Sequence, residues 1–276
     1  MKPVNFAYER PRHLADALGL LADESAHAKV LAGGQSLGPM LNMRLVQPDL
    51  IVDITALAEL KHAEKQGDYV VLGACVTHAD IEDGRVPDAT NGAMRGVAGN
   101  IAYRAVRNRG TIGGSLTNAD PSADWVSALS ALGAEAVVRG AGGARTMAVE
   151  TYVTGALETV LGAGELLEAI RVPAQSASAR WGYHKVCRKT GEYAQAIGAV
   201  LLDRSRDVFR AVIGATESKP LVLSDARALF GGSYDLADFD RGAADAMLQS
   251  IGMTDPLVRQ IHTVALARAV RQASGA

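Results

Sequence analysis

The chain has 276 residues, enough for one large domain or two, and its 48% hydrophobic and 21% charged residues are ordinary for a globular protein. A formal net charge of −2 provides no basic excess for nucleic-acid phosphates, which argues against a nucleic-acid-binding role. Two cysteines without CxxC spacing exclude an iron–sulfur cluster held by this chain alone and do not support a zinc site.

The start of the sequence lacks the apolar run of a secretion signal or a transmembrane span. Cys75 and Cys187 are expected to be small buried hydrophobic residues in a reducing compartment. We therefore expect a cytoplasmic protein, with peripheral attachment at the inner membrane face left open. The six histidines do not cluster in sequence, so no metal site is expected.

Residues 1–55 are expected to form a small α/β unit. Leucines at helical spacing predict a helix over 12–23, and apolar runs predict strands at 29–31 and 50–54. Between these strands lies AGGQSLGPM, residues 32–40, whose glycines permit backbone shapes that a Cβ would forbid.

Residues 56–175 are expected to form a second unit of hairpins and helices. Gly67-Asp68 predicts a hairpin turn, and Thr77 is a predicted helix cap. A longer helix is predicted over about 92–106, with its apolar residues on one face. The remaining predicted elements are a helix at 125–132 and strands at 136–138, 146–149 and 166–172.

The stretch RNRGTIGGSLTNADPSAD, residues 107–124, combines glycines with short polar side chains. Asp120-Pro121 predicts a helix start, with Asp as the N-cap and Pro at the first helical position. Exposed N–H groups in such a loop, together with a helix terminus, can surround an anion. Two such stretches in one chain suggest a single long, phosphate-bearing ligand held at two points.

The alternative for each stretch is a tight turn without a ligand. Neither is the dinucleotide fingerprint GxGxxG or the phosphate loop GxxxxGK[ST]. The residues alone therefore predict anion-binding loops and do not name the ligand.

The last third of the chain is expected to follow a small, polar linker at 174–179. Alternating patterns predict three strands, at 180–188, 194–202 and 208–216, which form a sheet covered by two or three helices. The final helix is predicted to begin at Asp255-Pro256. Its expected apolar face consists of Leu257, Val258, Ile261, Val264 and Ala265.

Three stretches together resemble the FAD-binding medium subunit of the molybdenum hydroxylases, the flavoprotein of the carbon monoxide dehydrogenase and xanthine dehydrogenase family. They are AGGQSLGPMLNMRLVQPDLIVDI (32–54), RNRGTIGGSLTNADPSAD (107–124) and KVCRKTGEYAQAIGA (185–199), in the family's order. The resemblance implies an α+β fold. A two-subdomain FAD-binding domain of the PCMH type would span 1–175, divided near residue 55, and a C-terminal domain of the carbon monoxide dehydrogenase flavoprotein type would span 178–276.

The resemblance implies noncovalent FAD binding at the two glycine-rich stretches. By motif position, the residues implied in the first are Ala32, Gly33, Gly34, Gln35, Ser36 and Leu37, and those in the second are Thr111, Gly114, Ser115, Asn118 and Asp124. Asp124 is expected to accept a hydrogen bond from a ribose or ribityl hydroxyl; the alternative is a solvated residue in the first turn of a helix. Family members often have His at the position of Asn118, which leaves any effect on the flavin open.

The third stretch implies two residues in the environment of the flavin ring. Lys185 is expected to bind at the flavin and stabilise negative charge on the reduced ring, and Tyr193 is expected to gate access at the ring face. The alternatives are a solvated lysine on a strand and a tyrosine of the core or surface.

The resemblance also implies the partners and the reaction. A large molybdenum-cofactor subunit oxidises the substrate, a small subunit relays electrons through two [2Fe–2S] clusters, and this chain's FAD passes them to an external acceptor, in a dimer of heterotrimers. Two alternatives are a self-contained flavin oxidase or reductase of the same fold, and a non-catalytic assembly module. The substrate (carbon monoxide, a purine, an N-heterocycle such as a nicotine derivative, or an aldehyde) and the acceptor stay open.

Overall fold

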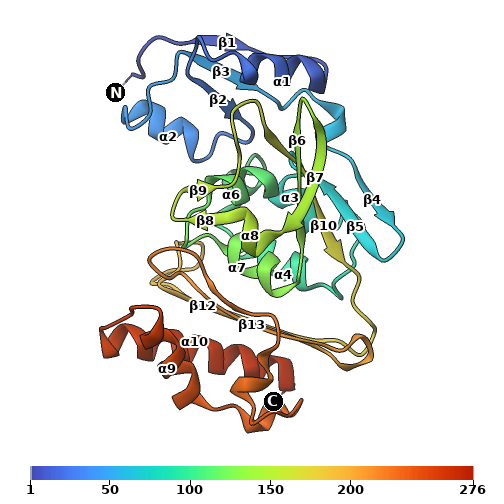
Figure 1. Ribbon diagram of the computed structural model, residues 1–276, viewed down its shortest axis with the longest axis vertical. Coiled ribbons are helices and arrows are strands. Elements are labelled where there is room, and N and C mark those ends of the chain that lie inside the picture. Colours follow the sequence, from blue (N-terminus) through green and yellow to red (C-terminus); the bar gives the residue numbers. More distant parts are fainter. Residues whose placement is uncertain (1, 276) are drawn as a thin grey trace.

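Three main β-sheets follow one another along the long axis of the computed structural model, which describes residues 2–275 (Figure 1). Each sheet lies against its own cluster of buried hydrophobic side chains. Residues 1 and 276, the outer limits of the two predicted domains, lie outside the described part. The chain is an α+β protein, as the sequence predicted.

The first sheet is parallel, in the order β1-β3-β2. Its strands are β1 (Ala7–Glu9), β2 (Ala28–Leu31) and β3 (Leu50–Asp53), with α1 (Leu14–Ala22) and α2 (Leu37–Asn42) in the connections and the short η1 (Ala58–Leu60) after β3. The apolar strand β3 is buried and central, whereas the residues of β1 are exposed. Strand β1 was not predicted because its three residues have no apolar pattern.

The middle sheet is antiparallel, in the order β4-β5-β10-β6-β7. Its strands are β4 (Ala63–Gln66), β5 (Tyr69–Gly73), β6 (Glu135–Gly140), β7 (Gly143–Ala148) and β10 (Leu166–Pro173). The predicted hairpin at Gly67-Asp68 joins β4 to β5. Strand β10 arrives last in sequence and lies at the centre, so it joins two hairpins into one sheet.

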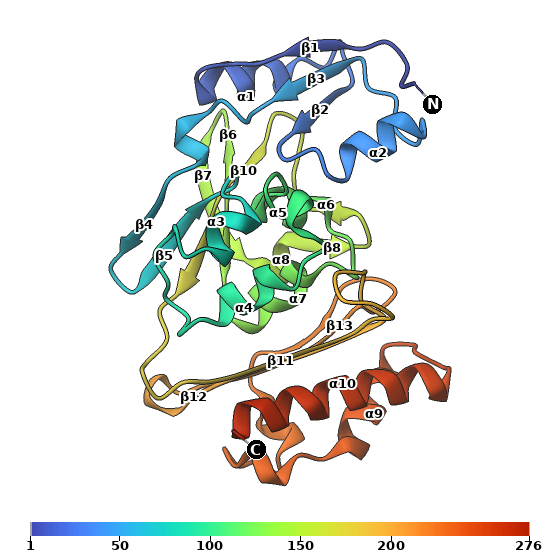
Figure 2. The same cartoon turned by 180° about the vertical axis from the view of Figure 1, so that it is seen from behind.

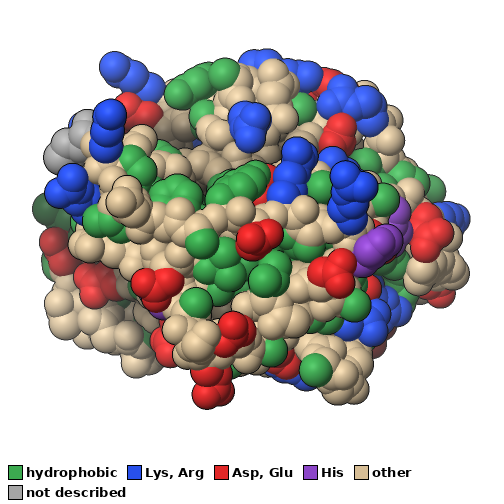
Figure 3. Space-filling model, turned by 90° about the horizontal axis from the view of Figure 1, so that it is seen from above, with side chains coloured by type: hydrophobic (Ala, Val, Ile, Leu, Met, Phe, Trp, Pro, Cys, Tyr) green, Lys and Arg blue, Asp and Glu red, His purple; other side chains and the backbone are tan. Residues whose placement is uncertain are grey.

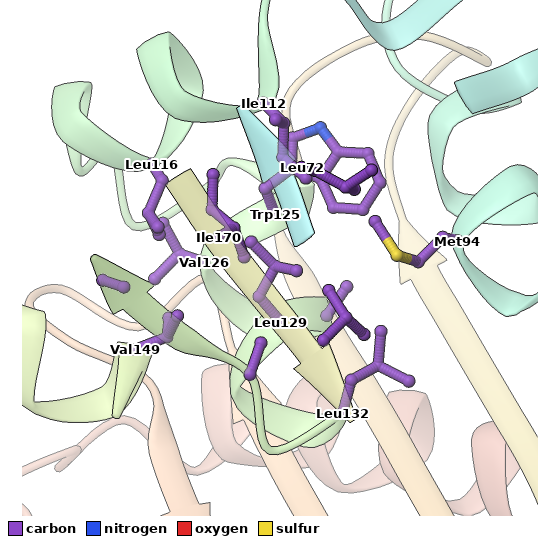
Figure 4. Close-up of a cluster of buried hydrophobic side chains, with 14 of the residues drawn as sticks. Leu72, Met94, Ile112, Leu116, Trp125, Val126, Leu129, Leu132, Val149 and Ile170 are labelled. Atoms are coloured by element: carbon purple, nitrogen blue, oxygen red, sulfur yellow. The ribbon is translucent and has the colours of Figure 1, made fainter. Parts of the chain in front are cut away.

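Short helices lie in the connections between the strands of the middle sheet and contribute to its core. They are α3 (His78–Glu82), α4 (Ala93–Gly99), α5 (Arg104–Arg107), α6 (Ile112–Asn118), α7 (Asp124–Ala131) and α8 (Val149–Tyr152), and the small hairpin β8 (Val153–Gly155) and β9 (Glu158–Thr159) follows α8. Thr77 caps α3 in a capping box with Asp80, as its position predicted. The core packs Trp125 and Leu129 of α7 against Ile112 and Leu116 of α6 and Ile170 of β10 (Figure 4).

Two predicted helices differ from the structure. The single helix expected over 92–106 is divided into α4 and α5, because Ala102 has a left-handed φ of 43° that a continuous helix does not allow. The helix expected to begin at Asp120-Pro121 begins instead at Asp124, since Ala119 at φ 50° ends α6 and Asp120 caps only a turn, accepting from the Ser122 N–H at 2.9 Å. Both breaks lie in the glycine-rich region and its approach.

The connection to the last sheet is anchored on both sides. The N–H groups of Ala174 and Gln175 donate to backbone oxygens of Asp68 and Ala89, at 2.7 and 2.8 Å. The hydroxyl of Ser176 donates to Asp203 at 2.7 Å. The predicted linker is therefore an ordered crossing between the middle and C-terminal sheets.

The C-terminal sheet has four antiparallel strands rather than the three expected: β11 (Arg180–Val186), β12 (Ala196–Asp203), β13 (Val208–Gly214) and the short β14 (Leu221–Leu223). The helices α9 (Arg241–Ser250) and α10 (Pro256–Ser274) lie on the side away from the middle sheet (Figures 1 and 2). Short 3₁₀ turns η2 (Arg204–Arg206), η3 (Ala226–Leu229) and η4 (Leu236–Asp238) connect these elements.

The buried face of α10 is only partly the predicted one: Ala265 is buried as expected. Asp255 caps the helix as expected, but Leu257, Val258 and Ile261 are exposed. The buried face begins near His262 and continues through Leu266, Ala269 and Val270. A Cβ at Gly182 or Gly198 would overlap the α10 backbone, so these two strand glycines let the middle and end of the helix lie directly on the sheet. Close packing here, rather than the position of large apolar residues, selects the buried face.

The surface is chemically mixed. Figure 3 views the end that carries the first sheet and shows positive, negative and hydrophobic side chains interspersed there. Within residues 2–275, no helix has both the length and the apolar character needed to cross a membrane.

Cys75 is buried, which raises the pKa of its thiol to about 12, whereas Cys187 is partly exposed, contrary to the expectation that both are buried.

The buried His78 lies between the core and the second glycine-rich stretch. The indole N–H of Trp125 donates to Nδ1 of His78 at 3.1 Å, so this nitrogen carries no proton. A Cβ at Gly110 would lie 2.9 Å from the imidazole, and the His78 N–H donates to the Gly110 carbonyl at 2.9 Å. Burial lowers the pKa of His78 from 6.5 to about 4, and the charge of Arg107 acts in the same direction.

This histidine predicts a pH dependence of stability. Because the pKa of His78 is lower in the folded chain, the unfolded chain binds the proton first as the pH falls from 6.5 towards about 4. We expect the free energy of unfolding to fall by about 3 kcal/mol from this residue over that window, and none of the loss above it. Urea unfolding of His78→Gln, whose amide oxygen can accept from Trp125 without titrating, should show a shallower decline. Parallel curves for the two proteins would contradict this role.

Candidate functional site

The two glycine-rich stretches touch through their backbones. A Cβ at Gly33 would overlap the carbonyl oxygen of Arg109 and lie 2.8 Å from Cα of Gly110. A Cβ at Gly114 would lie 3.5 Å from that of Ala32. Residues separated by about 80 positions therefore meet because glycine leaves room for the main chain. The structure brings together the two motifs that the sequence predicted to act together.

The first stretch offers unpaired backbone donors. Gly34 has a φ of 73°, which turns the chain from β2 into α2. Within residues 2–275, the N–H groups of Gly33, Gly34, Gln35 and Ser36 have no hydrogen-bond acceptor, while the Gln35 side chain donates to the Gly33 carbonyl at 3.2 Å. Adjacent free N–H groups in a tight turn are suited to an anionic ligand.

The second stretch is different from the exposed loop that the sequence predicted. Thr111 is the N-cap of α6, and its hydroxyl accepts from the Gly114 N–H at 3.0 Å. The N–H groups of Ile112 and Gly113 donate to backbone oxygens of Val76 and Ala74. These donors are therefore occupied within the protein, because the N-terminus of α6 lies against the chain that follows β5.

What α6 presents instead is a polar side. Its buried residues are Ile112, Gly113 and Leu116, whereas Ser115 and Asn118 are partly exposed. Thr111, Ser115 and Asn118 follow at helical spacing and so share a side of the helix. The side of Gly114 where a Cβ would stand faces Ala32, which places this part of α6 beside the first stretch.

Asp124 and Lys185 form a buried ion pair. Nζ of Lys185 lies 2.9 Å from Oδ2 of Asp124, and both side chains are 8% exposed. The Tyr183 hydroxyl donates to Oδ1 at 2.8 Å. Burial raises the pKa of Asp124, and the charge of Lys185 opposes the shift; burial also raises that of Tyr183. Asp124 is neither solvated nor open, so it orients Lys185 from the first residue of α7.

Lys185 has a second hydrogen-bond partner. Its ammonium donates to the backbone oxygen of Asn100 at 3.0 Å, in the turn between α4 and α5. With a carboxylate and a carbonyl as partners, the side chain is held in one direction. The alternative of a freely solvated strand lysine is therefore wrong.

Tyr193 lies in the loop between β11 and β12 and is 65% exposed. Partial desolvation raises the pKa of its phenol, and the negative charge of Asp120 adds to the shift. The loop lies beside the second glycine-rich stretch, since the N–H of Ala194 donates to the Ser122 carbonyl at 3.4 Å. Tyr193 is therefore an exposed residue next to this stretch and not a core residue.

Three contributors were missed by the sequence interpretation. Tyr183 stands two residues before Lys185, so strand alternation already placed both side chains on one face. His78 and Arg107 gave no such signal, because Trp125, the partner of His78, and Glu82, which holds the guanidinium of Arg107, are distant in sequence. The structure alone reveals that they hold the second stretch and the turn before it.

Comparison with known proteins agrees with this geometry. Residues 4–175 match the family model of the FAD-binding domain in molybdopterin dehydrogenases. The chain is 36% identical over 225 residues to the caffeine dehydrogenase subunit beta of Pseudomonas sp. strain CBB1, covering 80% of this chain and 76% of that one. It is 34% identical over 251 residues to the carbon monoxide dehydrogenase medium chain of Hydrogenophaga pseudoflava, covering 90% and 88%.

Solved structures show the same likeness. A chain of carbon monoxide dehydrogenase from Hydrogenophaga pseudoflava superposes with a TM-score of 0.89 at 31% identity, covering 100% of this chain and 99% of that one. A chain of quinoline 2-oxidoreductase from Pseudomonas putida 86 gives 0.86 at 29% identity, with the same coverage. The chain therefore belongs to the family of FAD-binding medium subunits of the molybdenum hydroxylases.

Proposed function

We propose that this chain is the electron-transfer subunit of a heterotrimeric molybdenum hydroxylase and holds FAD between its two glycine-rich stretches. The observation that carries the proposal is the backbone contact of Gly33 with Arg109 and Gly110, beside a row of free N–H groups. A long ligand with an anionic centre fits such a junction, since the donors lie in one stretch and the polar side chains in the other. The residues present therefore fit FAD.

Each predicted residue has a role that its surroundings support. Ala32, Gly33, Gly34, Gln35, Ser36 and Leu37 would surround the pyrophosphate, and Ser115, Asn118 and Asp124 would offer polar groups to the sugar portions. Thr111 and Gly114, which are hydrogen-bonded to each other, would instead shape the start of α6 beside the ligand. Asn118 can donate and accept, so it can replace the His common in the family for binding. Asp124 retains lone pairs beside its bonds to Tyr183 and Lys185, although its low exposure leaves orientation of Lys185 as its main contribution.

Bound FAD supplies a redox centre that exchanges electrons singly or in pairs, and the protein tunes and positions it. Lys185 would offset negative charge on the reduced ring, because its ammonium is buried and fixed. Tyr193 would control access to the ring from outside, since it is exposed on a loop whose Ala194 N–H donates to Ser122 of the second glycine-rich stretch.

The proposed partners follow from the family. A small subunit with two [2Fe–2S] clusters would deliver electrons from a large molybdenum-cofactor subunit, in a dimer of heterotrimers in the cytoplasm. The relatives are named for caffeine, carbon monoxide, nicotine and glyceraldehyde, so this chain does not indicate the substrate. We place the FAD-binding domain at 1–175 and the C-terminal domain at 178–276.

The electron-transfer role predicts separable half-reactions in the complex purified from its source. After FAD is removed, substrate should still bleach the iron–sulfur absorbance, while reduction of the external acceptor should stop and should return when FAD is added. Full-rate acceptor reduction without FAD would contradict the role. Substrate oxidation by this chain alone with FAD would favour the self-contained flavoenzyme instead.

The backbone contact predicts the effect of Gly33→Ala. The added methyl group overlaps the Arg109 carbonyl and must separate the stretches, so we expect FAD affinity to fall by about tenfold or more, at least about 1.4 kcal/mol. Titration of the deflavinated protein, followed by flavin fluorescence, measures the change. Gly19→Ala in α1 is the matched control, because a Cβ there meets nothing within 4 Å. Equal affinities for the two variants would refute the contact's importance.

The position of Tyr193 predicts faster or slower flavin reoxidation in Tyr193→Ala. Removing the exposed ring opens the space beside its loop, so external acceptors should reach the flavin differently while the remaining contacts retain it. Stopped-flow reoxidation of the reduced complex measures the rate, with flavin content determined in parallel. An unchanged rate with flavin retained would dispose of the gating role.

A further inference from the structure

The turn between α4 and α5 has three consecutive carbonyls bound by cationic side chains. Lys185 donates to the oxygen of Asn100 at 3.0 Å. Nη1 of Arg107 donates to the oxygens of Ile101 and Ala102, at 2.9 and 3.0 Å. Charge-assisted bonds to adjacent carbonyls fix a short turn more firmly than neutral ones do.

This turn needs such support. Ala102 has a left-handed φ of 43°, a conformation that costs a residue with a Cβ free energy unless its surroundings enforce it. The guanidinium of Arg107 is itself held by Glu82 of α3, which accepts from Nε at 2.8 Å and from Nη2 at 2.9 Å. The Arg107 side chain is only 12% exposed. The guanidinium of Arg107 therefore joins α3 to the strained turn through hydrogen bonds on both sides.

The turn between α4 and α5 also supports the loop that carries Tyr193. Gly191, at φ 88°, packs so closely on Ala102 that a Cβ there would lie 2.5 Å from the Ala102 carbonyl oxygen. Ile101 and Gly191 form an isolated parallel bridge. Tyr193 follows two residues later, so the position of its backbone depends on where the Ile101–Ala102 segment lies.

We infer that Arg107 is a positioning residue for electron exit: it holds the carbonyls of Ile101 and Ala102, the turn they form seats Gly191, and Gly191 places Tyr193 over the flavin site. This inference rests on the proposed gating by Tyr193. Arg107 is the first residue of the second glycine-rich stretch, but among residues 2–275 its side chain forms no hydrogen bond with Tyr193; its partners are Glu82, Ile101 and Ala102. Its effect passes through the backbone.

Arg107→Lys in the intact complex tests the inference. A lysine keeps the charge beside Glu82 but cannot form the bidentate pair and reach both carbonyls, since the fork geometry is lost. Arg85→Lys is the matched control: Arg85 pairs with Asp80 and Asp83 in the same charged cluster and makes no bond to the turn. The measurement is stopped-flow reoxidation of the reduced flavin by ferricyanide, with flavin content determined for every variant.

We expect Arg107→Lys to change the reoxidation rate by about fivefold with FAD retained, and Arg85→Lys to leave it within about twofold. In a Tyr193→Ala background, Arg107→Lys should add nothing, because both act through the same side chain. A change in Tyr193→Ala alone, with no change in Arg107→Lys or with additive effects, would overturn the inference. No effect of Tyr193→Ala would instead refute the gating itself, which separates the two failures.

Gly191→Ala examines the same contact from the other side. Its methyl group would press on the Ala102 carbonyl, so the reoxidation rate should shift as in Arg107→Lys, again only when Tyr193 is present. This variant decides the matter if Arg107→Lys does not fold, and thermal unfolding curves distinguish the two situations. A normal rate in a folded, flavin-loaded Gly191→Ala protein would overturn the inference as well.

Discussion

The close approach of two backbones, at Gly33 and at Arg109–Gly110, is the constraint on which the rest of the site depends. It can exist only where a Cβ is missing, and it brings the parallel first sheet against the helices that pack on the middle sheet. The core supports this contact, because His78 packs on Gly110 and is itself hydrogen-bonded to the buried Trp125. The site is thus built from the core outwards, and its free N–H groups remain on the first stretch.

Buried charge supplies a second constraint. Asp124 and Lys185 form a pair at 2.9 Å that lies almost out of water, and Tyr183 completes it. Removing such charges from water costs much of what their attraction returns, so the pair contributes little net stability. It does hold the Lys185 ammonium in one direction, which a solvated lysine lacks.

The sequence predicted most elements and several of their ends, because these depend on local chemistry. The Thr77 and Asp255 caps and the hairpin at Gly67-Asp68 were found where their residues indicated. The helix expected over 92–106 was interrupted at Ala102, and no local pattern announces that break. Its left-handed conformation is maintained by the packing of Gly191, which is distant in sequence, and by nearby Arg107, whose guanidinium is held by distant Glu82. The predicted apolar face of α10 was right for Ala265 and wrong for Leu257, Val258 and Ile261, because glycines of separate strands decide which part of the helix packs on the sheet.

The sequence by itself determined the family, the two glycine-rich stretches and the residue types available to a ligand, since glycines and short polar side chains leave a local signature. Only the tertiary structure decided how they are used. It showed that the N–H groups of residues 33–36 have no acceptor among residues 2–275, while those of Ile112 and Gly113 are occupied. It also joined Lys185 to Asp124, 61 residues away. Such pairings depend on the packing of separate sheets, and no spacing within one segment encodes them.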